Sequence, residues 1–515
     1  MNSDFLFYLY LERRAVLDQN RLGVNGDQAE RLDSQYDLVV VGAGIAGLNA
    51  LHAASRHLPP TARVLIIDVK DSPGGMWTMA YDYVRLHQPH PLFTVGGSKW
   101  TWRKPPHYLA AGDEVQQHLA SCLETLRDQF DVEERFGHYV SDVREVSRSG
   151  NWGAQVDFRK VGDPNKTITV EADRVIHAAG FDYVAPNSIE FTSKSVLSIT
   201  PTELSTTLAN HQNAPVYIVG GGKTGMDTIV AALKANPKRV VTLINGDGTY
   251  YWNRTKYFPS GLRRWTGGAL AAHVIRDCAM RFDGHNEGDM RAHFIATYAV
   301  NNDPRSKNFM FGLLSEDENK QIEMGLNDKL WDYLEDVVDG ETGPVMRMRS
   351  GAEMPVPEGS IFVNCTGSLF RTQSAGDRMP CLSPNDVVLS INTHEAVHIL
   401  TTYSSFILSH LFLCGKLRGA GLYFLDLEAL LQKDKQAFSA ACIVQGYHNQ
   451  LMGLKNLPLS SLKHFGMDLN RWYPLPRRLW AIYRIRKTGP EDIQHCRESL
   501  DALVKRFDIL GGQLT

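Results

Sequence analysis

The chain has 515 residues, which is long enough for two or three domains that each bury a hydrophobic core. Its composition, 43% hydrophobic and 22% charged, is ordinary for a globular protein, and 54 basic residues against 57 acidic ones exclude nucleic acid as a main partner. Seven cysteines without a Cys-x-x-Cys pair exclude a disulfide framework and a redox-active dithiol, and they indicate a reducing compartment.

The first apolar run, FLFYLYL at residues 5–11, is the only segment that suggests a signal peptide. It follows Asp4 instead of a basic region and has no small-residue cleavage site after it. We therefore predict an N-terminal leader over residues 1–35, either a packed helix or disordered. A second apolar run, residues 396–415, contains two histidines and several hydroxyl side chains and falls short of a membrane-spanning helix. The sequence predicts a cytoplasmic protein.

Three glycines directly follow the first predicted strand. We expect a buried parallel strand over residues 36–41 and a helix over residues 48–58, joined by a turn that contains Gly42, Gly44 and Gly47. In such a turn the first glycine permits the tight bend, the second lets a pyrophosphate approach the backbone, and the third allows close packing of helix on strand. The free N–H groups at the start of the helix then face the phosphates.

Two features downstream indicate which dinucleotide this loop binds. The next strand, RVLIID, ends at Asp68, whose carboxylate is placed to accept hydrogen bonds from a ribose 2′-hydroxyl. It is followed by SPGGMW, in which Gly75 and Trp77 supply a glycine turn and an indole where a flavin ring is approached. The alternative for Trp77 is a place in the core. We predict FAD at this loop.

Two similar strands suggest how the chain passes between domains. Residues 152–158 and 167–170 predict paired strands, and ADRVIHAAG predicts a strand that ends at Gly180; EGSIFVNCTG, ending at Gly367, has the same shape. We interpret the two turns as the points where the chain leaves and re-enters the FAD domain. The predicted fold is α/β, with two Rossmann-type dinucleotide-binding domains. The expected boundaries are 36–190 and 350–385 for the FAD-binding domain, 191–349 for the NAD(P)-binding domain inserted in it, and 386–515 for a helical C-terminal region that packs on the FAD domain.

A second glycine loop repeats the design of the first. Gly220, Gly222 and Gly225 follow the strand VYIV, and with Thr224 they open a second helix. No glycine pair with an indole comes after this loop, so we assign it the nicotinamide cofactor. The alternative is a loop that has lost its nucleotide.

The end of the next strand bears on the choice between NADP(H) and NAD(H). Asn245 stands where an acid binds a free ribose 2′-hydroxyl and repels a 2′-phosphate. Arg254 and Lys256 follow shortly after, so Arg254 is expected to be either a ligand of the 2′-phosphate or a surface base. Asp247, an acid near the same position, favours NAD(H) instead. Because Asn245, Arg254 and Lys256 together favour the phosphorylated cofactor, we predict NADP(H).

Two aromatic-rich stretches each allow a structural and a functional interpretation. Residues 250–258 contain five aromatic side chains that either line a substrate pocket or pack in the core. Residues 471–487 carry six basic residues and no acid, with Trp472, Trp480 and Tyr483 interleaved. They form either a surface helix whose aromatic face packs inward or a face that contacts a membrane surface. The 18 histidines show no metal-binding spacing, so no metal is expected.

Both glycine loops, the GGMW motif and the two small-residue turns together resemble the flavin-containing monooxygenases. The resemblance covers about residues 40–260 and the strand near 361–367, and residues 81–90 and 220–227 look most like plant auxin-forming flavin monooxygenases. It implies FAD and NADPH on two dinucleotide-binding domains, and oxygenation of a small organic substrate by O₂ through a C4a-peroxyflavin. The implied reaction is N- or S-hydroxylation or oxygen insertion beside a carbonyl.

The resemblance also implies roles for three residues of the segment YDYVRLHQPH. His87 and Gln88 occupy the positions at which the family places polar side chains beside the flavin N5 and C4a, which makes them the candidate catalytic residues. The alternative is an ordinary polar pair in a proline-rich loop. Arg85 is expected either to contact FAD or to brace the loop.

One departure from the family keeps other functions open. The family's F-x-G-x-x-x-H fingerprint corresponds to FTSKSVL, in which Phe191 is retained, Ser193 replaces the glycine and Leu197 the histidine. The family's histidine couples NADPH to the flavin. Its loss motivates two alternatives, an NAD(P)H-dependent flavin reductase or oxidase without oxygen transfer, and an FAD-binding redox sensor without turnover. Substrate identity and oligomeric state stay open.

Overall fold

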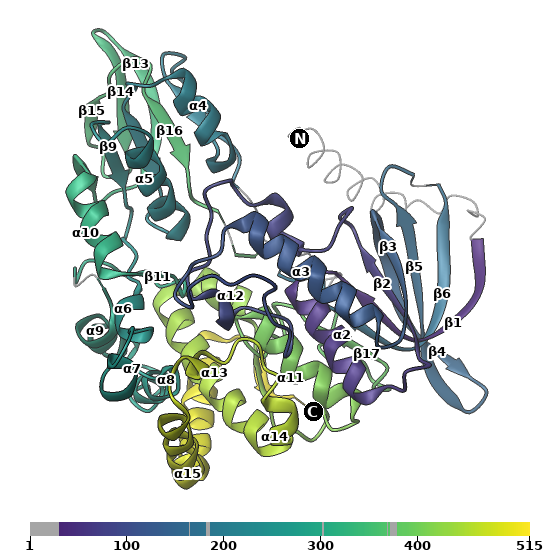
Figure 1. Ribbon diagram of the computed structural model, residues 1–515. Coiled ribbons are helices and arrows are strands. Elements are labelled where there is room, and N and C mark those ends of the chain that lie inside the picture. The colour runs from purple at the N-terminus through teal and green to yellow at the C-terminus, as the bar shows by residue number, and fades with distance from the viewer. Residues whose placement is uncertain are drawn as a thin grey trace.

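The computed structural model describes residues 30–163, 165–181, 186–300, 303–367, 369–370 and 379–514. Figure 1 shows one sheet on the right, a second sheet at the upper left, and a helical region below and between them. The leader predicted over residues 1–35 lies outside the described residues except for 30–35, which belong to the first strand.

The first unit is built on a mixed sheet of seven strands. They are β1 (Glu30–Val41), β2 (Arg63–Asp68), β3 (Asp131–Phe136), β4 (His138–Arg148), β5 (Asn151–Lys160), β6 (Thr167–His177) and β17 (Val388–Ser390). β1 lies between β2 and β6 and is parallel to both, while β4 and β5 continue from β6 in antiparallel order. The parallel strands contain uninterrupted apolar runs, such as residues 38–41 and 64–67, because both of their faces are covered.

Helices cover one face of this sheet and a hairpin covers the other. The helices are α2 (Ile45–His57), α3 (Gly112–Arg127) and α11 (Thr401–Leu413), which share a core with β1 and β2. α11 also bonds directly to α2, since Ser405 Oγ donates to the carbonyl of Ala46 at 2.5 Å. On the opposite face, alternate strand residues such as Ile67 pack with Phe158 of the β4–β5 hairpin.

The second unit contains a parallel sheet of five strands in the order β12-β9-β8-β16-β7. They are β7 (Leu197–Ile199), β8 (Val216–Val219), β9 (Val241–Ile244), β12 (Asp328–Leu330) and β16 (Ile361–Asn364). The unit also includes the antiparallel strands β13 (Leu334–Gly340), β14 (Gly343–Met348) and β15 (Glu353–Pro355), and the helices α4 (Leu204–Asn210), α5 (Lys223–Ala235) and α10 (Glu316–Gly325). Its elements fall between β6 and β17 of the first sheet, which confirms the predicted insertion.

The predicted position of the returning strand is wrong. β16, expected to rejoin the FAD domain within residues 350–385, pairs with β8 and β7 in the second sheet. The strand that returns to the first sheet is β17, which pairs with β6. The similar sequences of β6 and β16 reflect equivalent places in the two units, because each strand lies beside the strand that leads into a glycine turn.

A helical region draws on two separate parts of the sequence. Its elements are β10 (Trp252–Asn253), α6 (Arg254–Tyr257), α7 (Arg263–Thr266), α8 (Ala271–Ala279), α9 (Glu287–Tyr298), β11 (Leu313–Leu314), β18 (Tyr423–Leu425), α12 (Leu427–Lys433), α13 (Lys435–Asn456), α14 (Leu459–Leu462), α15 (Leu475–Phe507) and β19 (Gly511–Gln513). α8 and α9 share a core with α13 and α15, and Arg276 forms a two-bonded ion pair with Asp492 at 2.7 and 2.8 Å. In the C-terminal region, α11 therefore packs on the first unit. In contrast, α13 and α15 pack on α8 and α9, which the sequence placed in the NAD(P)-binding domain.

The aromatic stretch 250–258 belongs to this core. Tyr250, Trp252, Tyr257 and Phe258 are all at most 9% exposed and pack with Phe294. The core interpretation of these side chains is therefore correct.

Three of the buried histidines of the first unit lie on the helices that cover its sheet. They are His52 on α2, His118 on α3 and His410 on α11. Burial, with smaller contributions from neighbouring histidines and, for His52 and His410, from Arg56, lowers the pKa of His52 and His118 to about 4 and that of His410 to about 3. Because the unfolded chain binds protons near pH 6.5 and the folded chain does not, stability should fall as the pH drops below 6.5. Each histidine contributes up to about 1.4 kcal/mol per pH unit until its folded-state pKa is reached.

Urea unfolding at several pH values measures this loss. We expect the free energy of unfolding to fall steeply below pH 6.5, and the fall to be shallower in His118→Gln, which has one fewer buried titrating ring. The exposed His285→Gln is the matched control and should keep the wild-type slope. Equal slopes in wild type and His118→Gln would contradict the explanation.

Candidate functional site

The first glycine loop has the tight geometry that its sequence predicts. Gly42 has φ +102°, and a Cβ there would stand 2.5 Å from the carbonyl oxygen of Ala178. A Cβ on Gly47 would overlap the carbonyl oxygen of Gly42, so α2 lies directly against the turn. A Cβ on Gly44 would stand 3.3 Å from the Cα of Gly75, which places the GGMW turn against the loop. The backbone at this point has room for a ligand only while all three loop positions stay glycine.

Asp68 and the start of α2 fit a dinucleotide. One Asp68 carboxylate oxygen accepts from the N–H of Ala43 at 2.5 Å and the other from the N–H of Lys70 at 2.7 Å. Burial raises the pKa of Asp68, and these two N–H groups oppose the rise. A carboxylate has about four acceptor sites, so it can also accept from ribose hydroxyls. The N-cap of α2 is Gly44 and its first turn contains no acid, which leaves N–H groups available to phosphate.

The second loop repeats this packing. Gly220 has φ +110°, and a Cβ there would stand 3.0 Å from the carbonyl oxygen of Cys365, as Gly42 meets Ala178 in the first unit. A Cβ on Gly225 would overlap the carbonyl of Gly220. A Cβ on Gly222, the N-cap of α5, would meet nothing within 4 Å, so the helix start is open. Thr224 lies in this first turn, which again contains no acid. Both loops therefore have the form of an anion-binding helix start.

Two candidate FAD residues beside the first loop differ in what they contact. Trp77 lies in a short 3₁₀ helix, Gly75–Met79, and is half-buried with its ring edge-on to Phe93, centroids 5.7 Å apart. Arg85 is exposed, and its guanidinium donates to the carbonyl of Leu109 at 3.0 Å and lies near the ring of Tyr108. Arg85 therefore braces its loop.

A segment of the first unit contacts the helix that starts at the second loop. The hydroxyl of Tyr81 donates to Asp227 at 3.0 Å, and the hydroxyl of Tyr83 lies 2.9 Å from that of Thr228. Both partners are on α5, where Lys223 also forms an ion pair with Asp227. Burial raises the pKa of Asp227, and Lys223 opposes the rise. Residues 81–88 and the first turns of α5 thus form a junction between the two units.

His87 lies in this junction together with Arg254. Nη1 of Arg254 donates to the carbonyl of His87 at 3.4 Å, and its Nη2 forms an ion pair with Glu318. Burial, with Lys223 and Arg254 nearby, lowers the pKa of His87 to about 3, so its ring is neutral near pH 7. Arg254 is therefore engaged between the two units.

Gln88, the other candidate catalytic residue, has a different partner. Its amide Nε2 lies 3.8 Å from Sδ of Met467 in the C-terminal region. His87 thus lies against the second unit, whereas Gln88 contacts the helical region, so the two side chains do not share a partner.

Lys307, a basic residue that the sequence did not point to, lies near the end of β9. Asp247 accepts from the hydroxyl of Tyr333 at 2.8 Å and from Nζ of Lys307 at 3.3 Å, and these contacts hold its pKa below the usual range. Asn245 is buried next to them. Further cations lie over two aromatic rings here: Arg305 and Lys329 over Trp331, and Arg349 over Tyr333. Lys307 is sixty residues from Asp247, so only the tertiary structure shows this pair.

The counterpart of the family fingerprint lies on the second unit. Phe191 packs on Phe362 of β16, ring centroids 5.0 Å apart, and the hydroxyl of Ser193 donates to Asp339 on β13. Leu197 begins β7 and is 37% exposed. A cavity of about 520 Å³ is lined by residues of 189–198. Ser193 thus contacts β13, while Leu197 lies on the edge strand β7 and pairs with Ile361 of β16.

The cysteines and the other possible metal ligands are dispersed over the part of the chain that the structure describes. All seven cysteines, each in a described part of the chain, are free, and six of them are buried. Among the described residues, no three His, Cys, Asp or Glu side chains are grouped to hold a metal ion.

Comparison with known proteins finds one family model and several sequence relatives, each of which matches part of the chain. A family model described as pyridine nucleotide-disulphide oxidoreductase matches residues 36–273. The chain is 27% identical over 217 residues to an uncharacterized protein of Mycobacterium tuberculosis, covering 39% of this chain and 36% of that protein. It is 23% identical over 223 residues to a probable FAD-binding monooxygenase, AlmA, of Acinetobacter sp, covering 42% and 43% respectively. The chain thus matches less than half the length of either relative.

Two solved structures of monooxygenases are also similar to this chain, at low sequence identity. A cyclohexanone monooxygenase variant from Rhodococcus sp. Phi1, bound to NADP⁺, is 15% identical, with a TM-score of 0.47 over 79% of this chain and 90% of that one. A flavin-containing monooxygenase from Stenotrophomonas maltophilia is also 15% identical, with a TM-score of 0.43 over 74% and 98%.

Proposed function

We propose, from the resemblance of its sequence motifs to those of flavin-containing monooxygenases and from the geometry of the site, that this chain is an FAD- and NADPH-dependent monooxygenase of a small organic substrate. The observation that carries the proposal is the junction, where Tyr81 and Tyr83 of the first unit bond to Asp227 and Thr228 on the helix of the second loop. Hydride transfer requires the reactive rings of two cofactors to meet at a fixed geometry. A junction beside the second glycine loop supports that geometry.

The first unit has the residues to hold FAD. Gly42, Gly44 and Gly47, with the acid-free first turn of α2, fit the pyrophosphate, and Asp68 fits the ribose. Trp77 follows Gly75 beside the loop, where its indole would contact the flavin ring system. The chemistry that the flavin supplies when bound is hydride acceptance and activation of O₂.

The chain's own contribution at the junction is charge, hydrogen bonding and exclusion of water. His87 is neutral near pH 7, so its ring has one donor and one acceptor nitrogen and carries no charge. The ion pair with Glu318 holds the guanidinium of Arg254 in position. Its positive charge can then stabilise negative charge that develops during the reaction at the junction. Both lie among buried side chains, which strengthens such interactions.

The second unit has the residues to hold NADPH, with a changed assignment for the 2′-phosphate. Asp247 forms an ion pair with Lys307, which offsets the negative charge that would otherwise repel a 2′-phosphate. Lys307 is 55% exposed and lies next to the strand end where the 2′ position is expected. We assign the 2′-phosphate contact to Lys307, and not to Arg254.

A reductase or oxidase without oxygen transfer is the second candidate, because Ser193 and Leu197 replace the fingerprint residues. Stopped-flow spectra of the flavin-loaded protein distinguish the two. We expect NADPH to reduce the flavin and O₂ then to produce a transient band at about 370–390 nm before the oxidised spectrum returns. Reduction and reoxidation without the band would support the reductase or oxidase. Absence of reduction would contradict both and leave a redox sensor.

A further inference from the structure

The first half of α15 exposes a row of large apolar side chains. Leu475, Leu479 and Tyr483 follow one another at intervals of four residues, and Trp480 lies beside them, so the helical period puts all four on one face. They are 59%, 55%, 66% and 54% exposed in that order. The opposite face, which includes Ile485, is buried against the helical core. A surface helix ordinarily turns polar residues outward, so this row is unusual.

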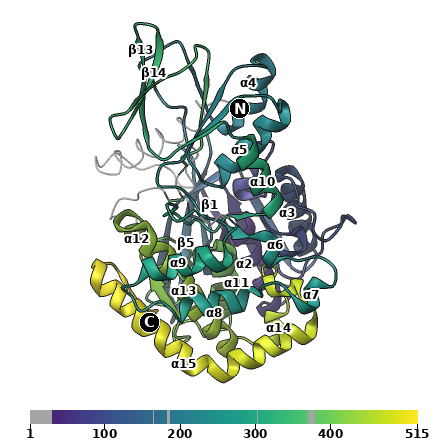
Figure 2. The same ribbon diagram turned by 90° about the vertical axis from the view of Figure 1, so that its left-hand side faces the viewer.

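α7 extends the same face. Leu262 is 82% exposed and Trp265 is 56% exposed. α7 is held against the start of α15, because Arg477 donates to the carbonyl of Arg264 at 2.9 Å and Arg264 Nε donates to the carbonyl of Trp472 at 2.8 Å. Figure 2 shows α15 along the lower edge of the molecule with α7 near one end of it. We call the exposed surface of Leu262, Trp265, Leu475, Leu479, Trp480 and Tyr483 the α7–α15 face.

The two segments that form this face carry basic residues and no acidic ones. The sequence has no Asp or Glu at positions 248–276 or 469–490. Asp468, just outside, is paired with Arg478 at 3.6 Å. The exposed bases around the face are Arg263, Arg471, Arg484, Arg486 and Lys487. Aromatic and leucine side chains framed by bases are the pattern of a surface that lies in the headgroup region of a membrane.

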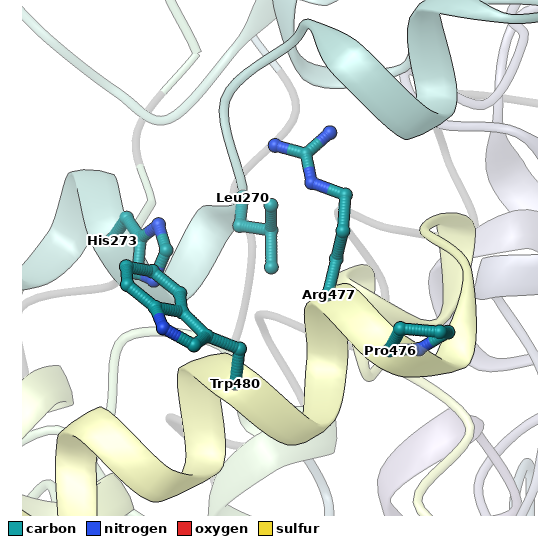
Figure 3. Close-up of a pocket in the computed structure, with 5 residues that line it drawn as sticks. All are labelled: Leu270, His273, Pro476, Arg477 and Trp480. Atoms are coloured by element: carbon teal, nitrogen blue, oxygen red, sulfur yellow. The ribbon is translucent and has the colours of Figure 1, made fainter.

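A notch opens within the face, between α8 and α15. It measures about 260 Å³ and is lined by Leu270, His273, Pro476, Arg477 and Trp480. Figure 3 shows the Trp480 indole beside the His273 ring, while the guanidinium of Arg477 extends away from α15. Burial and the neighbouring arginines lower the pKa of His273. The notch makes the face concave and combines apolar walls with an arginine.

We propose that the α7–α15 face docks the protein on the surface of a bilayer that contains anionic lipids. The leucine and aromatic side chains enter the headgroup region, and the bases contact lipid phosphates and carboxylates. A second copy of the chain fits less well, because a two-fold contact through this face would bring like charges together. Within the described ranges no helix is both long and apolar enough to cross a bilayer.

Co-sedimentation of the full-length, flavin-loaded protein with vesicles tests the proposal. We expect binding to phosphatidylcholine vesicles with about 30% phosphatidylserine, weaker binding to phosphatidylcholine alone, and release by salt. Leu479→Gln with Tyr483→Gln should weaken the partition at least tenfold. Arg486→Gln with Lys487→Gln should weaken it about twenty-fivefold on the anionic vesicles only, about fivefold for each base.

The matched control is Trp152→Gln, which removes an exposed indole on β5, outside the face. It should bind as wild type, and all variants should keep the wild-type flavin content. The proposal is overturned if wild type stays in the supernatant with anionic vesicles, or if the face variants bind as well as Trp152→Gln. It is also overturned if sedimentation velocity shows a dimer that Leu479→Gln dissociates, since the face then binds a second copy.

Discussion

Replacing Gly47 with valine is expected to yield folded protein without bound FAD. A Cβ at this position overlaps the carbonyl oxygen of Gly42, a backbone atom that cannot move without opening the turn. Overpacking of this kind costs about 3 kcal/mol, which corresponds to more than a hundredfold weaker binding if the cost falls on the loop. Absorbance at about 450 nm relative to protein measures flavin content.

The second loop supplies the matched comparison. Gly225→Val makes the equivalent overlap with the carbonyl of Gly220, so it should keep FAD and lose NADPH binding. Gly288→Ala places a Cβ where nothing lies within 4 Å and should change neither. Thermal unfolding confirms that the variants are folded. If Gly225→Val loses FAD as completely as Gly47→Val, FAD has been assigned to the wrong loop.

Replacing Lys307 with alanine is expected to raise the NADPH dissociation constant about ten- to a hundredfold. A charge-assisted contact to phosphate contributes about 1.5–3 kcal/mol, and each decade of affinity corresponds to about 1.4 kcal/mol. NADH has no 2′-phosphate, so its affinity should change little. Arg254→Ala should instead affect the two nucleotides alike and slow flavin reduction, because Arg254 is tied to Glu318 and to the carbonyl of His87.

Reduction rates measured over a range of NADPH and NADH concentrations separate these effects. Lys320→Ala, an exposed lysine on α10 of the same unit, controls for loss of charge. If Lys307→Ala weakens both nucleotides equally, Lys307 is not the phosphate ligand. If Arg254→Ala weakens only NADPH, the phosphate contact belongs to Arg254 as the sequence first suggested.

The parts of the site that the sequence predicted depend on local spacing. Three glycines after a buried strand, and an acid at the end of the next one, fix a strand–turn–helix whose contacts lie within thirty residues, as Ala43 and Asp68 show. The insertion of one unit in the other was also predicted, from the two similar strands that end near Gly180 and Gly367, although the second of these strands belongs to the inserted unit.

The errors concern contacts between distant parts of the chain. β16 looked like a strand of the first unit because its sequence resembles that of β6, and only the pairing with β7 and β8 shows its sheet. Arg254 is close to Asn245 in sequence, but the chain has entered α6 by then. Lys307 reaches Asp247 because residues 249 and 308 form a bridge that local sequence does not encode.

The glycine turns also bear on how the two units move. In each unit the first glycine of the turn lies against the carbonyl that follows a neighbouring strand, at Ala178 after β6 and at Cys365 after β16. These are also the places where the chain leaves one unit for the other. Both crossings between the units therefore lie beside the glycine loops. If the loops bind cofactors as proposed, we expect a cofactor at either loop to restrict rotation between the units, and so to affect the orientation in which the other cofactor is held.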